Sequence, residues 1–314
     1  MICSPFYDIL KKKRIAIVHD ALAVPAGSER SALYLSNIFP DAPIYISVYF
    51  PDNTYQEFKY KRIHPFPLSK FIKTERQYKA FYPWWFLFIS LLDLSQYDLI
   101  ISSSNFLAKF INPSLTSTHI CYLHNPIRYL RKTEVYSSKS APYGHFGIIA
   151  IRLLLPILCM IEIKKTKSIN NIITNSKNID YQIKNIYQKN ASIIYPPVDT
   201  DSFSVSNSTG DYYLYAERLI SHKRVDLVIC ACNKLKKSLV IAGDGLEREA
   251  LKQKAGDTIQ FLGRVSDIEL KRLYSDCKAL IFPSDEDFGL FQLKLKHQVV
   301  LRLPTGLEEC RRQY

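Results

Sequence analysis

The feature that most constrains the fold of this chain is the alternation of short apolar runs with helix-length segments. The runs are rich in β-branched residues, as buried strands are. In the first part of the chain they occupy residues 14–19, 44–49, 99–102, 119–123 and 171–174, and in the second part 212–216, 238–242, 259–262 and 279–282. Buried strands separated by helices, such as the helix expected over 29–39, predict an α/β fold with parallel sheets and right-handed crossovers.

The chain is predicted to form two domains, each of them Rossmann-like. Its 314 residues are enough for two cores, and Pro196-Pro197 followed by a Ser/Asn/Thr/Gly-rich stretch marks a boundary near 196–210. We expect an N-terminal extension at 1–13, a first domain at 14–200, a partial second domain at 201–290 and a separate tail at 291–314. Ligands of such domains bind at the carboxyl ends of the strands.

Composition narrows the classes of function. An apolar fraction of 47% indicates a globular protein, and seven cysteines without paired spacing argue against a disulfide framework or a zinc site. The formal net charge of +13 suits an anionic membrane or nucleic acid, or simply a solvated basic surface. Nucleic acid is disfavoured, because no helix-turn-helix, zinc finger or aromatic-basic platform accompanies the charge.

No segment is predicted to cross a membrane. The best candidate, residues 148–163, is shorter than the ~20 residues that spanning needs and is interrupted by Pro156. The basic run Lys11–Arg14 follows no apolar stretch, so it is not a signal peptide. The aromatic cluster Phe81–Phe88 suits a protein core, and beside a basic surface it also suits the interface of a bilayer.

A series of short motifs then carries a specific resemblance. In order along the chain they are Val18–Asp20, Gly27–Arg30, Phe39–Tyr45, Tyr97–Ser104, Cys121–Tyr129, Asn175–Ser176, Ile194–Asp199, Arg218–Leu219, Lys223–Leu227 and Gly243–Gly245. Together they resemble the mannosyltransferases of glycosyltransferase family 4 that build bacterial O-antigen and related polysaccharides. The resemblance covers residues 14 to 290.

The resemblance implies a GT-B fold and retaining transfer of mannose from GDP-mannose, without a metal or other cofactor. It also implies a lipid-linked glycan acceptor at the inner face of the cytoplasmic membrane, where the chain would lie as a peripheral protein on anionic lipid. GDP-mannose is the expected donor, and the sequence does not separate it securely from GDP-fucose or another nucleotide sugar.

The resemblance places the donor beside residues at strand ends. Arg218 and Lys223 would neutralise the diphosphate leaving group, and both side chains are expected to serve the ligand more than the fold. Gly27 would let backbone N–H groups approach a phosphate or sugar hydroxyl. Gly243 would lie on the nucleotide side, and Gly263 would bring backbone atoms to the base.

In the first domain the resemblance places His124 against the donor sugar, where it would hydrogen-bond a hydroxyl and steady positive charge on the ring. The departing phosphate can itself serve as the base, so a general-base role is not assigned to His124. His19, Asp20 and Arg128 would face the same cleft and meet the acceptor, although packing or surface roles suit them equally well.

The donor motif is incomplete. It begins at Glu286, and the family has a second glutamate eight residues later, where this chain has Lys294. Read one nucleotide out of register, the codons possible for Phe291–Val299 permit V-P-V-E-A-Q-A-S-G, which places a glutamate at position 294. This reading predicts a single-nucleotide frameshift after Leu290, an out-of-frame tail at 291–314 and a second sheet that ends at Phe282.

Three hypotheses follow. The gene is intact and the frameshift is a sequencing error, the product is an inactive remnant, or the chain is a basic membrane- or nucleic-acid-binding protein on the same fold. The nucleotide sequence across residues 285–314 tests the first. Salt-dependent binding to liposomes or oligonucleotides without sugar-nucleotide binding would favour the third.

Overall fold

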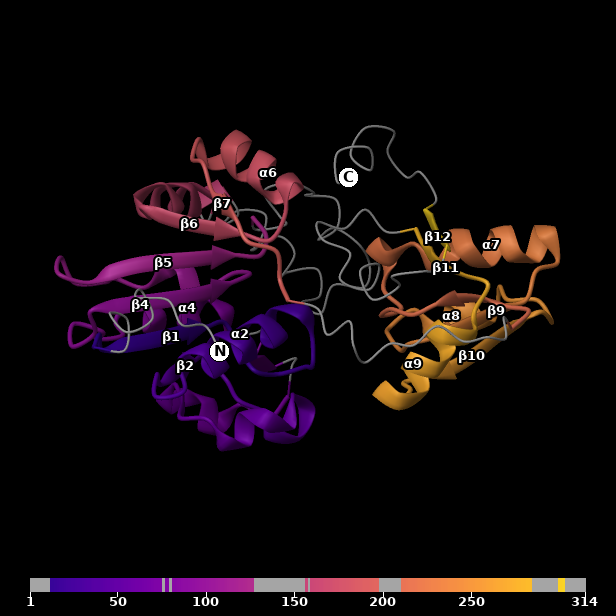
Figure 1. The fold of residues 1–314 in the computed structure, drawn as a ribbon, viewed down its shortest axis with the longest axis horizontal. Helices are drawn as coiled ribbons and strands as arrows, with labels where there is room; N and C mark the ends of the chain where they lie inside the picture. The colour runs from indigo at the N-terminus through magenta and orange to yellow at the C-terminus, as the bar shows by residue number, and fades with distance from the viewer. Residues whose placement is uncertain are drawn as a thin grey trace. The chain divides into compact units, whose positions relative to one another are not determined.

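The computed structural model describes residues 12–74, 77–78, 81–126, 156–157, 159–197, 210–283 and 299–302. The chain divides into two compact units, Met1–Pro197 and Val198–Tyr314. Each unit contains one sheet in which every strand pairing is parallel, so the predicted α/β class with two parallel sheets is confirmed (Figure 1).

Unit 1 is built on a seven-stranded sheet with the order β3-β2-β1-β4-β5-β6-β7. All five predicted strands are present, four of them with ends shifted by one to three residues. Its strands and helices are β1 (Ile15–His19), α2 (Gly27–Ile38), β2 (Ile44–Ile46), β3 (Ile63–Pro65), α4 (Tyr82–Ser90), β4 (Leu99–Ser104), β5 (Thr118–Leu123), β6 (Asn171–Thr174), α6 (Lys177–Tyr187) and β7 (Ser192–Ile193).

The two faces of this sheet bury alternate residues of the strands, as the pleat requires. On one face Ile17, Ile44 and Ile101 pack in one cluster with Ala32 and Leu33 of α2. On the other, Ala16, Val18 and Ile100 pack with Trp85 and Ile89 of α4, while Cys121 and Ile172 pack with α6. Because β1 and β4 are covered on both sides, their residues are buried along their whole length.

Unit 2 contains a five-stranded sheet with the order β10-β9-β8-β11-β12. Its inner strands are short apolar runs that bury residues on both faces, including Leu214, Tyr215, Leu239 and Ile241. The elements are β8 (Tyr213–Tyr215), α7 (Val225–Leu235), β9 (Leu239–Ala242), α8 (Arg248–Lys252), β10 (Ile259–Gly263), α9 (Asp267–Asp276), β11 (Ala279–Phe282) and β12 (Val299–Arg302).

One expectation about the second sheet is wrong. The sheet does not end at Phe282, because β12, from the predicted tail, pairs in parallel with β11 in register from Ala279↔Val299 to Phe282↔Arg302. The exposed edge of β11 offers unpaired backbone groups, and a β-branched run such as Val299-Val300 is suited to pair with them. The strand at residues 299–302 was not predicted from the sequence.

A buried ion pair links segments that follow β4 and β5 in the chain. Nζ of Lys109 lies 2.5 Å from Oε1 of Glu162, and both side chains are completely buried. The hydroxyl of Tyr187, at the end of α6, donates to the same oxygen at 2.6 Å. Lys109 lies in the short 3₁₀ helix Ala108–Phe110, and Glu162 lies in a helical stretch at 159–168, so the pair joins three segments distant in sequence.

We predict that removing either charge destabilises the protein strongly, because the remaining charge stays buried without its partner. Lys109→Met or Glu162→Leu should each lower the free energy of unfolding by ~3–5 kcal/mol, measured by urea denaturation. The double variant Lys109→Met/Glu162→Leu should lose much less than the sum of the two. Additive losses would show that the pair is not coupled.

Candidate functional site

Five polar residues gather where β1, β4 and β5 end. Ser103 and Ser104 end β4, His19 ends β1 and precedes Asp20, and His124 directly follows β5. Because these strands are parallel neighbours, their carboxyl ends share one edge of the sheet. All five residues are buried. The structure therefore brings together three residues that the sequence singled out, His19, Asp20 and His124.

Ser103 connects the two histidines. Nδ1 of His19 lies 3.0 Å from the carbonyl oxygen of Ser103 and 3.1 Å from its Oγ. The same Oγ lies 2.8 Å from Nε2 of His124. Nε2 of His19 is buried and has no hydrogen-bond partner among the described residues. Ser103 was not predicted as a site residue, although three serines in succession at the end of an otherwise apolar strand are a visible signal.

His124 is held in place by its backbone as well as by its ring. Its N–H donates to the carbonyl of Ser104 at 3.0 Å, and its carbonyl accepts from Nδ2 of Asn175 at 3.2 Å. The ring of Tyr122 contacts the imidazole edge-on, with the centroids 4.9 Å apart. Burial, with a smaller contribution from His19, lowers the pKa of His124 to about 3, so the ring is neutral at pH 7.

The carboxylate of Asp20 organises the loop after β4. One oxygen accepts the backbone N–H groups of Leu107 and Ala108 at 2.8 and 2.6 Å, and the other accepts those of Asn105 and Phe106 at 2.6 and 2.9 Å. Four donors compensate the buried charge. The predicted contact of Asp20 with an acceptor stays a prediction, and the structure gives its carboxylate this structural role.

Gly27 is the first residue of α2, so it lies where the loop after β1 enters its helix. Ala26, at the N-cap, supplies no side-chain hydrogen bond to the first turn. Glu29 in this turn is buried, and Ser28 Oγ donates to its carboxylate at 2.8 Å. Burial raises the pKa of Glu29, against a lowering by His19. Glu29 is a second polar residue at this edge of unit 1 that was not predicted.

In unit 2, Arg218 and a glycine loop lie side by side at the carboxyl ends of β8 and β9. Arg218 is exposed. Leu219 donates its N–H to the carbonyl of Asp244 at 3.0 Å and accepts from Glu247 at 3.1 Å. A Cβ on Gly243 would lie 2.0 Å from the carbonyl oxygen of Glu217, and one on Gly245 would lie 2.2 Å from that of Leu219. Only glycine permits this approach of the two loops.

Gly263 is the last residue of β10 and lies at the same edge of the sheet. It has a left-handed φ of 74°, and its carbonyl accepts the N–H of Gly243 at 2.7 Å. The structure therefore connects the predicted nucleotide-side residues Gly243 and Gly263 directly. Their predicted contacts with a nucleotide base stay predictions.

Lys223 is placed differently from Arg218. Its Nζ lies 2.6 Å from Oε1 of Glu217, and both side chains are less than a tenth exposed. The ammonium also lies 5.7 Å from the ring centroid of Phe282. Lys223 thus has a role in holding the fold, and its predicted contact with the diphosphate stays a prediction. Glu217 was not predicted, because its importance depends on a partner that the fold supplies.

Two predicted site residues, Arg128 and Glu286, lie outside the described residues, as do Leu290 and Lys294.

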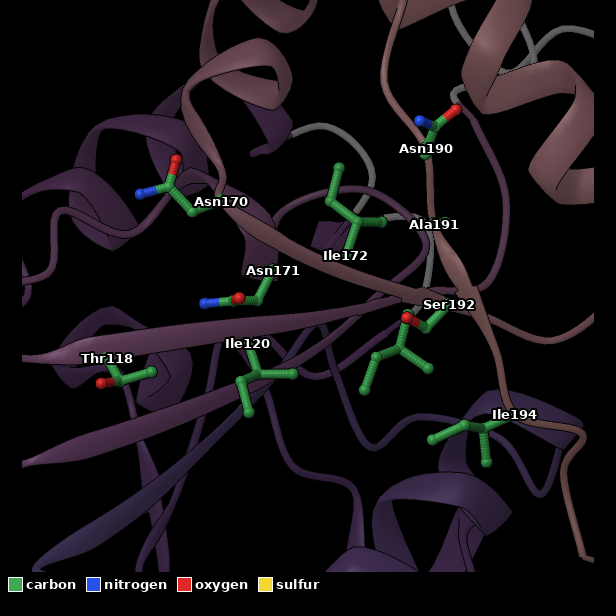
Figure 2. A pocket seen from close by; sticks show the side chains of 10 residues that line it. Thr118, Ile120, Asn170, Asn171, Ile172, Asn190, Ala191, Ser192 and Ile194 are labelled. Atoms are coloured by element: carbon green, nitrogen blue, oxygen red, sulfur yellow. The ribbon is translucent and has the colours of Figure 1, made fainter.

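A shallow pocket lies on unit 1 away from this cluster. Thr118, Asn171 and Ser192 are the first residues of β5, β6 and β7, so the pocket is at the amino ends of these strands (Figure 2). The histidines lie at the opposite ends, so the pocket is separate from the candidate site. Its lining consists of Thr118, Ile120, Asn170, Asn171, Ile172, Ile173, Asn190, Ala191, Ser192 and Ile194.

The part of the chain that contains Arg218 and the glycine loop matches a known family. Residues 199–293 match the family described as Glycosyl transferases group 1. Most of unit 2 is therefore similar to glycosyl transferases of group 1. The chain is also similar to the O-antigen chain mannosyltransferase RfbU of Salmonella typhimurium, with 25% identity over 193 residues. That match covers 59% of this chain and 54% of RfbU, so it spans about half of the relative's length.

Solved structures share the fold over most of the chain. The Anabaena protein HepE, solved in complex with UDP and glucose, has a TM-score of 0.60 at 15% identity, over 90% of this chain and 78% of that one. Sucrose-phosphate synthase from Thermosynechococcus elongatus has a TM-score of 0.62 at 13% identity, over 89% and 78%. These neighbours are GT-B glycosyltransferases, and the similarity confirms the predicted GT-B fold.

We predict that the protein loses stability as the pH falls from about 6.5 to 4. Burial lowers the pKa of His124 to about 3 and that of His119 to about 4, from 6.5. Over this range the unfolded chain takes up protons that the folded chain does not, so each histidine contributes up to ~1.4 kcal/mol per pH unit. This stability is fully present above about pH 6.5.

Urea denaturation at a series of pH values measures this effect. His124→Gln and His119→Gln should each reduce the slope between pH 6.5 and 4, and neither should change the slope above pH 7.5. Slopes equal to that of the unmodified protein in both variants would show that these rings are not buried in neutral form.

Proposed function

We propose that this chain derives from a retaining glycosyltransferase that moves mannose from GDP-mannose to a lipid-linked glycan. Three findings support the proposal: the similarity of unit 2 to group 1 glycosyl transferases, the GT-B fold, and the similarity to a mannosyltransferase. The donor and the acceptor rest on the family resemblance of the sequence motifs. The neighbour solved with UDP makes UDP-sugars the natural comparison for any test of donor choice.

The observation that carries the proposal is the exposed Arg218 beside the glycine loop, within the segment that matches the family. A diphosphate leaving group gains negative charge as the glycosidic bond breaks, and a nearby guanidinium stabilises that charge. Because Gly243 and Gly245 have no side chains, their backbone lies directly against the residues on either side of Arg218. The N–H groups of these two glycines already donate to the carbonyl of Gly263 and to the carboxylate of Asp244, so the charge for the diphosphate comes from Arg218.

Lys223 would act on the donor through its neighbours. Its ammonium is shared with Glu217, so its full charge is not free for a phosphate. It holds the carboxylate of Glu217, the residue whose backbone carbonyl faces Gly243. We therefore assign diphosphate binding principally to Arg218 and the support of its loop to Lys223.

In unit 1 the polar edge suits a neutral, hydroxyl-rich ligand. His124 is neutral at pH 7, and the charge of Asp20 is compensated by four backbone N–H groups. His19 keeps one ring nitrogen without a partner among the described residues. These properties support the assignment of His124 to a sugar hydroxyl and of His19 to the acceptor.

We further propose that this 314-residue chain does not itself catalyse transfer. Lys294 places a cation where the family has the carboxylate that binds the ribose hydroxyls. The family match ends at residue 293, three residues after Leu290, which supports a change of reading frame at that point. A frame-restored protein would regain the second glutamate at position 294.

A transfer assay tests these proposals. The frame-restored protein should transfer mannose from GDP-mannose to a lipid-linked acceptor, and this chain should not, with folding of both checked by circular dichroism. In the restored protein Arg218→Ala should weaken donor binding by ~1.5–3 kcal/mol, roughly 10- to 150-fold. Arg272→Ala on α9 removes the same charge from an exposed site and should have no effect. Equal turnover by the two chains, or unchanged donor affinity in Arg218→Ala, contradicts the assignment.

We also propose that unit 1 rests on anionic lipid at the cytoplasmic face of the membrane. None of the described helices is both long and apolar enough to cross a bilayer. However, Trp84, Leu87 and Leu91 are about half exposed or more, and their spacing places them on one side of α4. The stretch at 159–168 packs against the same 3₁₀ helix as α4, through Glu162 and Lys109, and exposes Met160.

Charge and apolar surface occur together in this region. Lys70 and Lys73 precede α4, and Lys164 and Lys167 lie near Met160 in sequence, all of them exposed. An amphipathic surface with aromatic and aliphatic residues flanked by lysines binds bilayers whose lipids are anionic. The buried Trp85 anchors α4 from the opposite side, so the exposed face is held in place by the core.

Vesicle binding tests this proposal. The protein should co-sediment with phosphatidylglycerol vesicles more than with phosphatidylcholine vesicles, and high salt should release it. Of the two tryptophans, Trp85 is fully buried, so a blue shift on binding reports Trp84. Trp84→Ser and Leu87→Ser should weaken binding, whereas Ile268→Ser, at an exposed site on α9, should not. Equal binding by all variants excludes α4 as the contact.

A further inference from the structure

The hydrogen bonds around Ser103 determine where the protons of both histidines lie. The carbonyl oxygen of Ser103 can only accept a hydrogen bond, and Nδ1 of His19 lies 3.0 Å from it. Nδ1 of His19 must therefore carry a proton. In the neutral ring, Nε2 of His19 then has a lone pair and is an acceptor.

The same reasoning extends to the second ring. With Nδ1–H of His19 directed at the carbonyl and Oγ of Ser103, the hydroxyl of Ser103 has its own proton left to donate. Nε2 of His124 lies 2.8 Å from that Oγ and is the available acceptor. Because burial keeps His124 neutral, with its pKa lowered to about 3, the single ring proton then lies on Nδ1.

We propose that Ser103 is a positioning residue that holds His124 as its Nδ1–H tautomer and so makes it a hydrogen-bond donor toward the ligand. A neutral histidine free in water favours the opposite, Nε2–H tautomer, so the fold selects the less common form. All the atoms that make this selection lie at the adjacent ends of β1, β4 and β5.

The two histidines then have complementary roles. Because Nε2 of His124 is engaged with Ser103, Nδ1–H is the nitrogen left to donate, whereas the buried Nε2 of His19 has no hydrogen-bond partner among the described residues and is left to accept. A ligand that meets both must offer an acceptor oxygen to one and a donor O–H to the other, which a polyhydroxylated molecule does. In this form His124 cannot take up a proton through Nδ1, so it would bind oxygen of the sugar rather than act as a base.

The catalytic relevance of this arrangement rests on the proposed function, but the arrangement can be tested without any transfer activity. The experiment uses the 314-residue chain with ¹⁵N- and ¹³C-labelled histidine. Two-bond ¹⁵N–¹H correlation spectra at pH 7 distinguish the two tautomers of each ring. The resonances of His124 and His19 are assigned from His124→Gln and His19→Gln.

We expect both His19 and His124 in their Nδ1–H forms. Ser103→Ala should shift His124 to the Nε2–H form or to a mixture, and leave His19 unchanged, since the backbone carbonyl at position 103 remains. Ser103→Thr keeps a hydroxyl and should keep the Nδ1–H form of His124. Ser102→Ala, next to it, removes the hydroxyl that lies 2.8 Å from Nε2 of His119 and should alter only that ring.

An Nε2–H form of His124 in the unmodified chain overturns the proposal, even if Ser103→Ala does not fold. So does an Nδ1–H form that persists in a folded Ser103→Ala variant. Loss of mannose transfer in a restored protein would bear only on the proposed function, because the tautomers are measured without substrate.

Discussion

The candidate site in unit 1 depends on one buried carboxylate. Asp20 follows β1, yet its two oxygens bind four consecutive backbone N–H groups that follow β4, from Asn105 to Ala108. The N–H groups of Leu107 and Ala108 are buried, and the short 3₁₀ helix that this loop enters has no side-chain cap of its own, so Asp20 supplies the acceptor that they need. By fixing this loop, Asp20 fixes the end of β4, and with it Ser103 between the two histidines. Asp20 therefore has a structural role whether or not it also contacts a ligand.

Most of the sheets could be predicted from sequence because parallel strands buried on both faces leave an unambiguous pattern. The strand at residues 171–174 and the one at 279–282 have the predicted bounds. The strands that were missed are at the edges of the sheets. β3 contains His64 and Pro65, and β7 has only two residues, so neither shows an apolar run. An edge strand needs backbone hydrogen bonds on one side alone, and its side chains carry little signal.

The candidate site was predicted only in part, because some of its residues matter through contacts with side chains that the fold brings to them. His19, Asp20 and His124 stand out because they follow apolar runs, and strand order then brings them together. Ser103, Glu29 and Glu217 matter through contacts that sequence spacing does not reveal: Glu217 with Lys223, six residues away, and Ser103 with His19, 84 residues away. A cation read from sequence as a ligand-binding group can equally be the counter-ion of a buried carboxylate, and only the fold separates Arg218 from Lys223.

The two units also differ in the charge that they offer at their strand ends. In unit 1 His124 is neutral, the pKa of Glu29 is raised and the carboxylate of Asp20 is fully hydrogen-bonded, so little charge remains for a ligand. In unit 2 the side chain of Arg218 is exposed to solvent. Hydroxyl groups are best recognised by directed neutral donors and acceptors, whereas a diphosphate needs a cation. The proposed division between a hydroxyl-binding edge in unit 1 and a phosphate-binding edge in unit 2 therefore rests on which charges each unit compensates internally.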